Sequence, residues 1–195
     1  MKVLGILGSP LRDGNTEILL KAFLEGAAAG GAAVEEIRLR ELKISPCLEI
    51  YHCFKDGTCP IKDDMAGLYD KLVAADVVVL ASPIFFYNVS AQAKAMIDRT
   101  QALWARRYIL KKDFPPGRQG ILLAVGAAGL CWYGSPLLRE HEGLLGNRED
   151  GRLKATKIII SSGKSYAVDK KAALQLGANA YLTKPYTASP WRSAR

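Results

Sequence analysis

Short apolar runs that end in small residues, alternating with helix-like segments, constrain the fold of this chain more than any other feature. Residues 2–8, 75–81 and 120–126 are such runs, and their length and branched side chains suit strands buried on both faces. Helical spacing follows the first run, with Asn15 or Thr16 placed to cap the helix. This alternation predicts an α/β fold with a doubly wound parallel sheet. Such a sheet binds its ligand beyond the carboxyl ends of its strands.

Weaker patterns predict the remaining elements. They are a strand within 34–42, helices at 65–73 and 90–107, and late strands at 158–160 and 180–182 around a helix near 170–176. On the helix at 90–107, Asp98 and Arg99 are expected on the polar side. Although six segments are strand-like, we predict a five-stranded sheet with helices on both faces.

Length, composition and charge indicate which broad classes of protein this chain can belong to. The chain has 195 residues, enough for one domain with a full core. It has no run of about 18 apolar residues and no signal pattern at its start, so we expect a cytoplasmic protein without a membrane segment. The net charge is +8, but 10 of the 27 basic and only 3 of the 19 acidic side chains lie in residues 148–195. A basic end of this kind is more often a solvated face than a phosphate-backbone contact, so we expect no nucleic-acid partner.

The loop after the first apolar run carries the strongest chemical signal. Gly8-Ser9-Pro10 and Gly14-Asn15-Thr16 lie between a buried strand and a helix start, where unpaired backbone N–H groups and the helix dipole favour an anion. Side chains of this loop add hydrogen-bond donors, and Arg12 adds a positive charge. The loop lacks the Gly-Lys-Ser/Thr ending of a Walker loop and the G-x-G-x-x-G spacing of a dinucleotide fingerprint. A terminal phosphate fits it, and a plain capped helix after a turn is the alternative.

Three motifs in order resemble those of the NADPH-dependent FMN reductases and iron–sulfur flavoproteins. They are the loop just described, the segment Ser82-Pro83-Ile84-Phe85-Phe86-Tyr87-Asn88, and Lys94-Ala95-Met96-Ile97-Asp98-Arg99. The resemblance spans about residues 1–129 and implies a flavodoxin-like fold. We therefore expect a flavodoxin-like FMN-binding core at 1–129, followed at 130–195 by a segment that completes the sheet or forms an atypical tail.

The resemblance also implies which residues bind the cofactor. The FMN phosphate would be held by Ser9, Arg12, Asn15 and Thr16. The isoalloxazine ring would be bordered by Pro83, Ile84, Phe85, Phe86, Tyr87 and Asn88, because a planar ring favours aromatic or apolar faces. Small residues of the third loop, Gly126 and Ala127, would allow the backbone to approach the other edge of the flavin. Core or dimer contacts are the alternative for the aromatic residues, and a plain turn is the alternative for the third loop.

The activity implied is hydride transfer from NAD(P)H to N5 of FMN and then electron delivery to a small acceptor, such as a quinone, free flavin, nitro compound or metal ion. No side chain is expected to act as acid or base, and a homodimer is expected. One alternative is a flavin-binding electron carrier without NAD(P)H turnover. Another is a receiver-like signalling domain, since Ser161 or Ser162 and Lys184 resemble the end of a response-regulator receiver.

The cysteines raise the question of an iron–sulfur cluster. Cys47, Cys53 and Cys59 match three of the four cysteine positions of the iron–sulfur branch, and Ile50 occupies the remaining one. Such clusters are usually held by four thiolates, so we expect no complete cluster here unless Cys131 reaches the site. Redox-active thiols, inert cysteines, or zinc with a water or His52 as fourth ligand are the alternatives.

Overall fold

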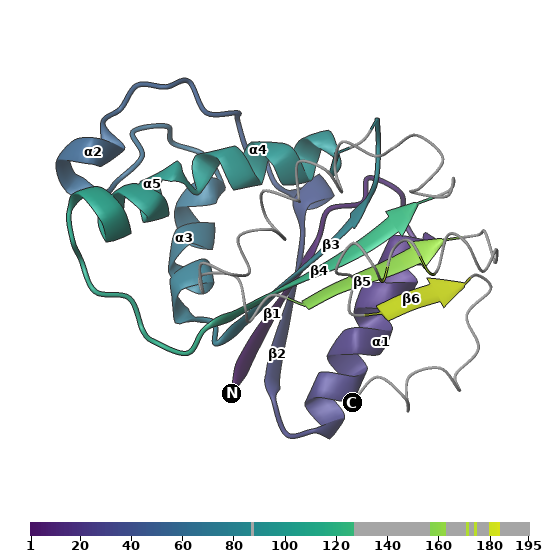
Figure 1. Cartoon of the computed structure of the whole chain (residues 1–195). Helices are drawn as coiled ribbons and strands as arrows, with labels where there is room; N and C mark the ends of the chain where they lie inside the picture. Colours follow the sequence, from purple (N-terminus) through teal and green to yellow (C-terminus); the bar gives the residue numbers. More distant parts are fainter. Residues whose placement is uncertain (87, 127–156, 163–170, 172–173, 175–179, 184–195) are drawn as a thin grey trace.

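The chain folds around one parallel β-sheet (Figure 1). The computed structural model describes residues 1–86, 88–126, 157–162 and 180–183, together with Lys171 and Leu174. The strands are β1 (Lys2–Leu7), β2 (Ala33–Arg38), β3 (Val77–Pro83), β4 (Gln119–Gly126), β5 (Lys157–Ser162) and β6 (Ala180–Thr183). Their order is β2-β1-β3-β4-β5-β6, and each neighbouring pair is parallel.

The predicted parallel α/β fold is confirmed, but the count of five strands is corrected. Five of the described strands follow the flavodoxin order 2-1-3-4-5. A sixth, β6, adds to the outer edge of β5, with Ile159 paired to Ala180 and Ser162 paired to Thr183. The sheet is therefore one strand wider than predicted.

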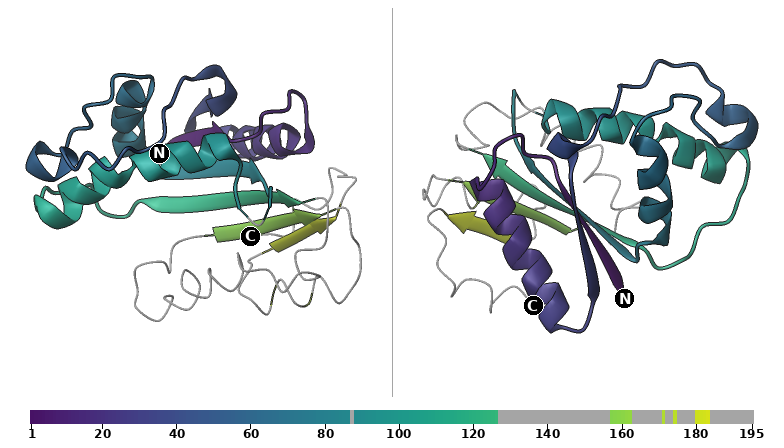
Figure 2. Two further views of the ribbon diagram at one scale, coloured as in Figure 1. Left: turned by 90° about the horizontal axis from the view of Figure 1, so that it is seen from above. Right: turned by 180° about the vertical axis from the view of Figure 1, so that it is seen from behind.

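Helices cover the sheet on both faces, because alternate residues of each buried strand point to opposite sides. On one face Leu19, Leu20 and Leu24 of α1 (Asn15–Ala29) pack against Leu7 of β1 and Leu123 of β4. The opposite face carries α3 (Met65–Ala74), α4 (Ala91–Arg99) and α5 (Gln101–Trp104). Figure 2 shows α1 lying apart from the group formed by α3, α4 and α5.

The helix predicted at 90–107 is divided. It consists of α4, α5 and a π-helical turn, η2 (Ala105–Ile109). The break falls at Thr100, whose hydroxyl donates to the carbonyl oxygen of Ile97 at 2.6 Å, and such a bond competes with the regular helical pattern. Two further short elements are the 3₁₀ turn η1 (Leu39–Glu41) and α2 (Cys53–Asp56).

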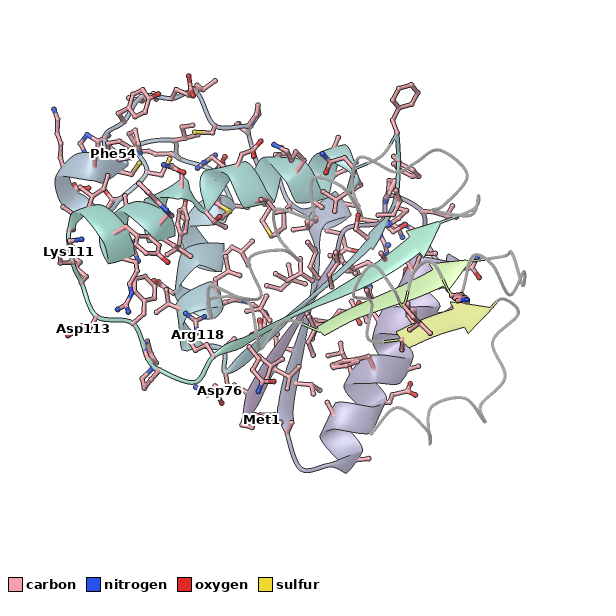
Figure 3. The ribbon with its side chains drawn as sticks, in the orientation of Figure 1. Met1, Phe54, Asp76, Lys111, Asp113 and Arg118 are labelled. Atoms are coloured by element: carbon pink, nitrogen blue, oxygen red, sulfur yellow. The ribbon has the colours of Figure 1, made fainter. Side chains whose placement is uncertain are left out.

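The amino-terminal edge of the sheet is fastened by backbone groups around Asp76. The Asp76 N–H donates to the carbonyl of Lys2, and its own carbonyl accepts the N–H of Gln119. Arg118 lies near Asp76 (Figure 3), and its Nε donates to the carbonyl of Ala75 at 3.0 Å. These contacts tie the starts of β1 and β4 to the residue that precedes β3.

None of the helices in the described ranges has the length and hydropathy needed to cross a bilayer.

Candidate functional site

Two loops and the end of β4 meet at the carboxyl edge of the sheet, as the sequence predicts for that edge. Leu7 of β1 is aligned with Ala81 of β3, and Pro83 of β3 is aligned with Val125 of β4. Beyond these pairs the Gly8 N–H still donates to the Ala81 carbonyl at 2.7 Å, and the Ile84 N–H donates to the Val125 carbonyl at 2.9 Å. The β1–α1 loop, the loop after β3 and the end of β4 are therefore neighbours.

The β1–α1 loop leads into a helix start that no side chain of the described residues caps. The residue that precedes the helix is Gly14, and no side chain caps the helix at this end. This corrects the prediction that Asn15 or Thr16 is the cap, because the helix begins at Asn15 itself. The first N–H groups of a helix have no partner within it, so an uncapped start with its positive dipole end suits an anion.

The four predicted phosphate ligands lie in different environments. Ser9 is buried, and its hydroxyl oxygen accepts the N–H of Leu11 at 3.3 Å, so it shapes the loop. Thr16 is also buried, in the first turn of α1. Arg12 and Asn15 are exposed, as side chains that reach toward a ligand in solvent would be.

The segment after β3 forms a tight turn that presents aromatic rings. The Phe85 N–H donates to the Asn88 carbonyl at 2.8 Å, and the Asn88 N–H donates back to Phe85 at 2.9 Å. Phe85 is 51% exposed and Phe86, at the tip, is 99% exposed. Phe86 adopts a left-handed φ of 46°, which is rare for a bulky residue and typical of functional sites. Pro83 and Ile84 are partly buried at its base.

Two predicted residues lie outside the described ranges. Tyr87 follows Phe86 in the chain, and Ala127 follows Gly126, the last residue of β4. Their proposed contacts with the flavin stay predictions.

Sequence reasoning missed Ser90, which joins two of the loops. Its side chain is fully buried, and its hydroxyl accepts the N–H of Ala93 at 3.2 Å, capping α4. The same hydroxyl donates to the carbonyl of Gly8, and the Ser90 N–H donates to the Ser82 hydroxyl at 3.0 Å. A serine directly before a helical pattern is a recognisable cap signal, but its second bond depends on the tertiary fold.

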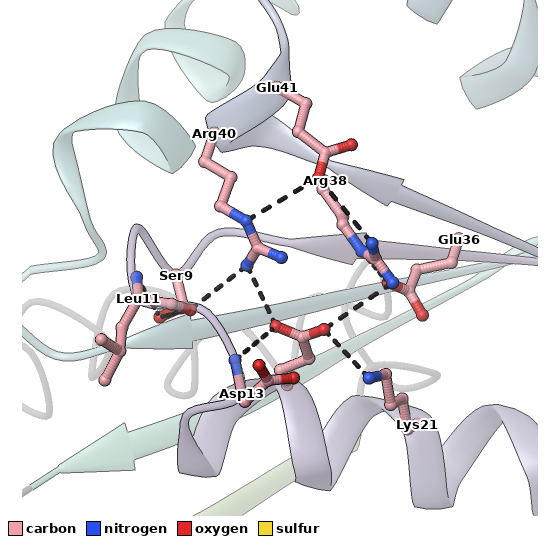
Figure 4. Close-up of polar contacts among 9 residues, drawn as sticks. Ser9, Leu11, Asp13, Lys21, Glu36, Arg38, Arg40 and Glu41 are labelled. Carbon is pink, nitrogen blue, oxygen red and sulfur yellow. Dashed lines mark hydrogen bonds and ion pairs between the residues drawn. The ribbon is translucent and has the colours of Figure 1, made fainter.

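A buried carboxylate beneath the β1–α1 loop was also missed. Glu17 in the first turn of α1 is surrounded by Lys21, Arg38 and Arg40 (Figure 4). No motif identifies this cluster, because its two arginines come from the end of β2 and from η1.

The described cysteines do not form a metal centre. Cys47, Cys53 and Cys59 are free and partly buried, and the described residues contain no group of three or more His, Cys, Asp or Glu side chains placed to hold a metal. Burial, together with the nearby Cys59 and Cys47, raises the pKa of the Cys53 thiol. Ile50 is exposed, and Cys131 lies outside the described residues. The described residues therefore do not fit a four-thiolate cluster, and its absence stays a prediction.

The cysteine-bearing loop is held by protein contacts. Arg99 is fully buried, which corrects its predicted place on the polar side of the helix. It makes two hydrogen bonds to Asp63, Nη1 to Oδ2 at 2.7 Å and Nη2 to Oδ1 at 3.1 Å, and it also donates to the carbonyl of Ser45. Although burial raises the pKa of Asp63, hydrogen bonds from Arg99 and the Ser45 N–H outweigh it, and the pKa is lowered.

The outer end of this loop is fastened by two more cations. Arg106 Nε donates to the carbonyl of Gly57 at 2.7 Å, and Lys112 Nζ donates to the carbonyl of Asp56 at 3.0 Å. Phe54 of α2 and Lys111 beyond η2 accordingly lie at the same end of the molecule (Figure 3). The loop therefore has a defined conformation without a metal ligand set.

A comparison with known protein families shows to which family the chain belongs. The family model described as NADPH-dependent FMN reductase matches residues 1–129, which contain all three loops. The chain belongs to this family.

Individual relatives agree with the family assignment. An iron–sulfur flavoprotein of Methanocaldococcus jannaschii is 41% identical over 103 residues, which are 53% of this chain and 53% of that protein. An iron–sulfur flavoprotein of Archaeoglobus fulgidus is 41% identical over 124 residues, which are 64% of this chain and 61% of that protein. The chain thus matches little more than half the length of these relatives.

Solved structures confirm the fold. The NAD(P)H:quinone oxidoreductase from Methanothermobacter marburgensis superposes with a TM-score of 0.66 at 18% identity, covering 90% of this chain and 92% of that one. Membership of the NADPH-dependent FMN reductase family confirms the resemblance noted from the sequence. It also supports the predicted class, an oxidoreductase that uses FMN and NAD(P)H.

Proposed function

We propose that this chain binds FMN at the carboxyl edge of β1, β3 and β4 and transfers electrons from NAD(P)H to a small acceptor such as a quinone. The observation that carries the proposal is the uncapped start of α1 beside the exposed aromatic turn after β3. The first element suits a phosphate monoester and the second suits a flat ring. Family membership and the sheet order support the same placement.

The residues present fit FMN in a specific way. Arg12 and Asn15 are exposed at the mouth of the loop and would donate hydrogen bonds to the phosphate. Ser9 and Thr16 are buried and would bound the pocket from below. Gly8 is closely packed, because an added Cβ would lie 3.0 Å from the Ala93 Cβ and its neighbours would have to shift.

The ring of FMN would lie against the turn after β3. Phe85 and Phe86 would supply apolar contacts, Pro83 and Ile84 would form the base, and Gly126 would allow close approach at the end of β4. When bound, FMN would supply the hydride and electron-transfer chemistry of the proposed reaction. The chain's own residues bind and orient it and shape the pocket above the exposed ring face. Tyr87, Asn88 and Ala127 complete the proposed set of contacts.

The finer features stay proposals. We expect a homodimer and a cytoplasmic location, and we propose a quinone, free flavin, nitro compound or metal ion as acceptor. The division into a core at 1–129 and a following segment at 130–195 also stays a prediction, although β5 and β6 extend the sheet of β1–β4.

The test is the affinity for FMN of the double variant Arg12→Ala, Asn15→Ala. Because each substitution removes a hydrogen bond to a charged group, binding should weaken by about 2–4 kcal/mol. Riboflavin, which lacks the phosphate, serves as the control ligand, and its affinity should change little. Unchanged FMN affinity in this variant, measured by fluorescence titration, would rule out the β1–α1 loop as the phosphate site.

A further inference from the structure

Glu17 is a buried carboxylate at the place where the phosphate is proposed to bind. Its side chain is 2% exposed and lies in the first turn of α1. Three cations surround it, with Lys21 Nζ at 3.1 Å, Arg40 Nη1 at 3.0 Å and Arg38 Nη2 at 3.7 Å (Figure 4). The Asp13 N–H also donates to it at 3.1 Å.

Arg40 differs from the other two cations because it joins the loop to the helix. Its side chain is only 10% exposed, whereas those of Arg38 and Lys21 are 36% and 44% exposed. Nη1 donates both to Glu17 and, at 3.2 Å, to the carbonyl of Leu11. Its buried Nε has no hydrogen-bond partner among the described residues, and the nearest carboxylate, that of Glu41, is 3.9 Å away.

These contacts determine the backbone of the loop. The Leu11 carbonyl is held by Arg40 and the Asp13 N–H by Glu17, so both ends of the segment 11–13 are fixed. Asp13 adopts a left-handed φ of 51°, which a non-glycine residue keeps only when its surroundings hold it. The Glu17–Arg40 pair contacts the backbone on both sides of this residue, directly before Gly14 and Asn15.

The Glu17–Arg40 pair also offsets the negative charge that Glu17 places near the proposed phosphate site. Burial raises the pKa of Glu17, but hydrogen bonds from Lys21, Arg40 and the Asp13 N–H outweigh it and lower the pKa to about 2. The carboxylate is therefore charged at neutral pH, beside the helix end where a phosphate is proposed. Without a close cation it would repel that phosphate, because like charges repel and a buried carboxylate is poorly screened by water.

We propose that Arg40 is a positioning residue for the phosphate group of FMN, acting through Glu17 and Leu11 without touching the ligand. It fixes the loop and neutralises the buried carboxylate, so that the start of α1 accepts a dianionic phosphate. The inference rests on the proposed function. The inference goes beyond that function because it makes the affinity for the phosphate depend on a residue of η1, outside the loop proposed to bind the ligand.

The experiment compares the dissociation constants of FMN and riboflavin for the wild type, Arg40→Met, Arg38→Met, Glu17→Gln and the double variant Arg40→Met, Glu17→Gln. Arg40→Met should weaken FMN binding by about tenfold or more, since it removes charge-assisted bonds, and should leave riboflavin binding within about twofold. Arg38→Met, the matched control, should change FMN binding by less than about threefold because that contact is long and exposed. The double variant should recover part of the lost affinity, because it removes a carboxylate whose charge Arg40 no longer offsets and that only Lys21 and Arg38 still face. A structural defect alone would weaken riboflavin binding as much as FMN binding.

Three results would overturn the inference: Arg40→Met binding FMN as Arg38→Met does, equal losses for FMN and riboflavin, or no recovery in the double variant. If Arg40→Met does not fold, Arg40→Lys is used in its place. This variant keeps the positive charge but loses the guanidinium group that donates to both Glu17 and the Leu11 carbonyl. It should then retain part of the preference for FMN over riboflavin, and full wild-type affinity would count against the inference. A wild-type chain with no preference for FMN over riboflavin would instead overturn the proposed function, which separates the two failures.

Discussion

At the scale of single residues, Glu17 links the stability of the chain to pH. Its pKa is lowered from 4.5 to about 2 by its hydrogen bonds, so the folded state holds this proton less tightly than the unfolded state. The resulting stabilisation is fully present above pH 4.5 and is lost as the pH falls toward 2. A shift of this size corresponds to about 3 kcal/mol.

Glu17→Gln should remove this dependence. We expect the free energy of unfolding of the wild type to fall by about 3 kcal/mol more than that of the variant between neutral pH and the acid limit. Urea unfolding at a series of pH values measures the difference. Parallel pH profiles for the two proteins would show that Glu17 is not held in its ionised form by the fold.

The sequence could predict the loop but not this cluster. Gly14, Asn15 and Thr16 are recognisable because strand, turn and helix signals are local. Arg40 lies 23 residues from Glu17, and the contact exists only because β2 runs parallel to β1 and ends above the loop. Nothing in their spacing indicates the pair.

At the scale of elements, Gly8 is where β1, β3 and α4 come closest. An added Cβ would lie 3.0 Å from the Cβ of Ala93 and 3.1 Å from the carbonyl oxygen of Ala81. The Ala81 carbonyl also accepts the Gly8 N–H, and Ser90 donates to the Gly8 carbonyl. A side chain here would separate the phosphate loop from the start of α4.

Gly8→Ala should therefore destabilise the chain by about 1–3 kcal/mol, the cost of overpacking a tight site. Gly26→Ala is the matched control, because this glycine lies in α1 with nothing within 4 Å of an added Cβ. That change should stabilise the chain by about 0.5–1 kcal/mol through helix propensity. Thermal unfolding of both variants checks the pair, and equal effects would contradict the close packing at Gly8.

The cysteine-bearing loop depends on the Asp63–Arg99 ion pair. Asp63→Asn should cost about 3–5 kcal/mol, because it leaves a buried guanidinium without its counter-charge. Asp64→Asn is the control. It removes one exposed acceptor of the Lys43 N–H and should cost no more than about 1.5 kcal/mol. Denaturant unfolding compares the two, and similar losses would show that the pair does not stabilise the loop.

Arg99 illustrates where helical spacing misleads. The pattern places it beside Asp98 on a polar face, and Asp98 does form an exposed pair with Lys94. Arg99 is buried instead because the loop from Ser45 to Asp63 folds over that side of α4 and supplies acceptors. Periodicity predicts which residues share a face, but it does not show what covers that face.

At the scale of the whole molecule, the fold and its ligand edge could be predicted because buried parallel strands have local signatures. The runs at 2–8, 75–81 and 120–126 all became neighbouring strands. The sequence also predicts the strands at 158–160 and 180–182. Their addition to one six-stranded sheet depends on pairing between residues that are far apart in the sequence. The predicted helix between them falls largely outside the described residues.

The most direct test of the account is anaerobic addition of NADPH or NADH to the FMN-loaded chain, followed through the visible absorbance of the flavin. The account predicts that the chain holds one FMN and that a nicotinamide donor bleaches this absorbance, which returns when a quinone is added. A loaded chain whose absorbance neither NADPH nor NADH changes would contradict it, and would indicate an electron carrier in place of an NAD(P)H-dependent oxidoreductase.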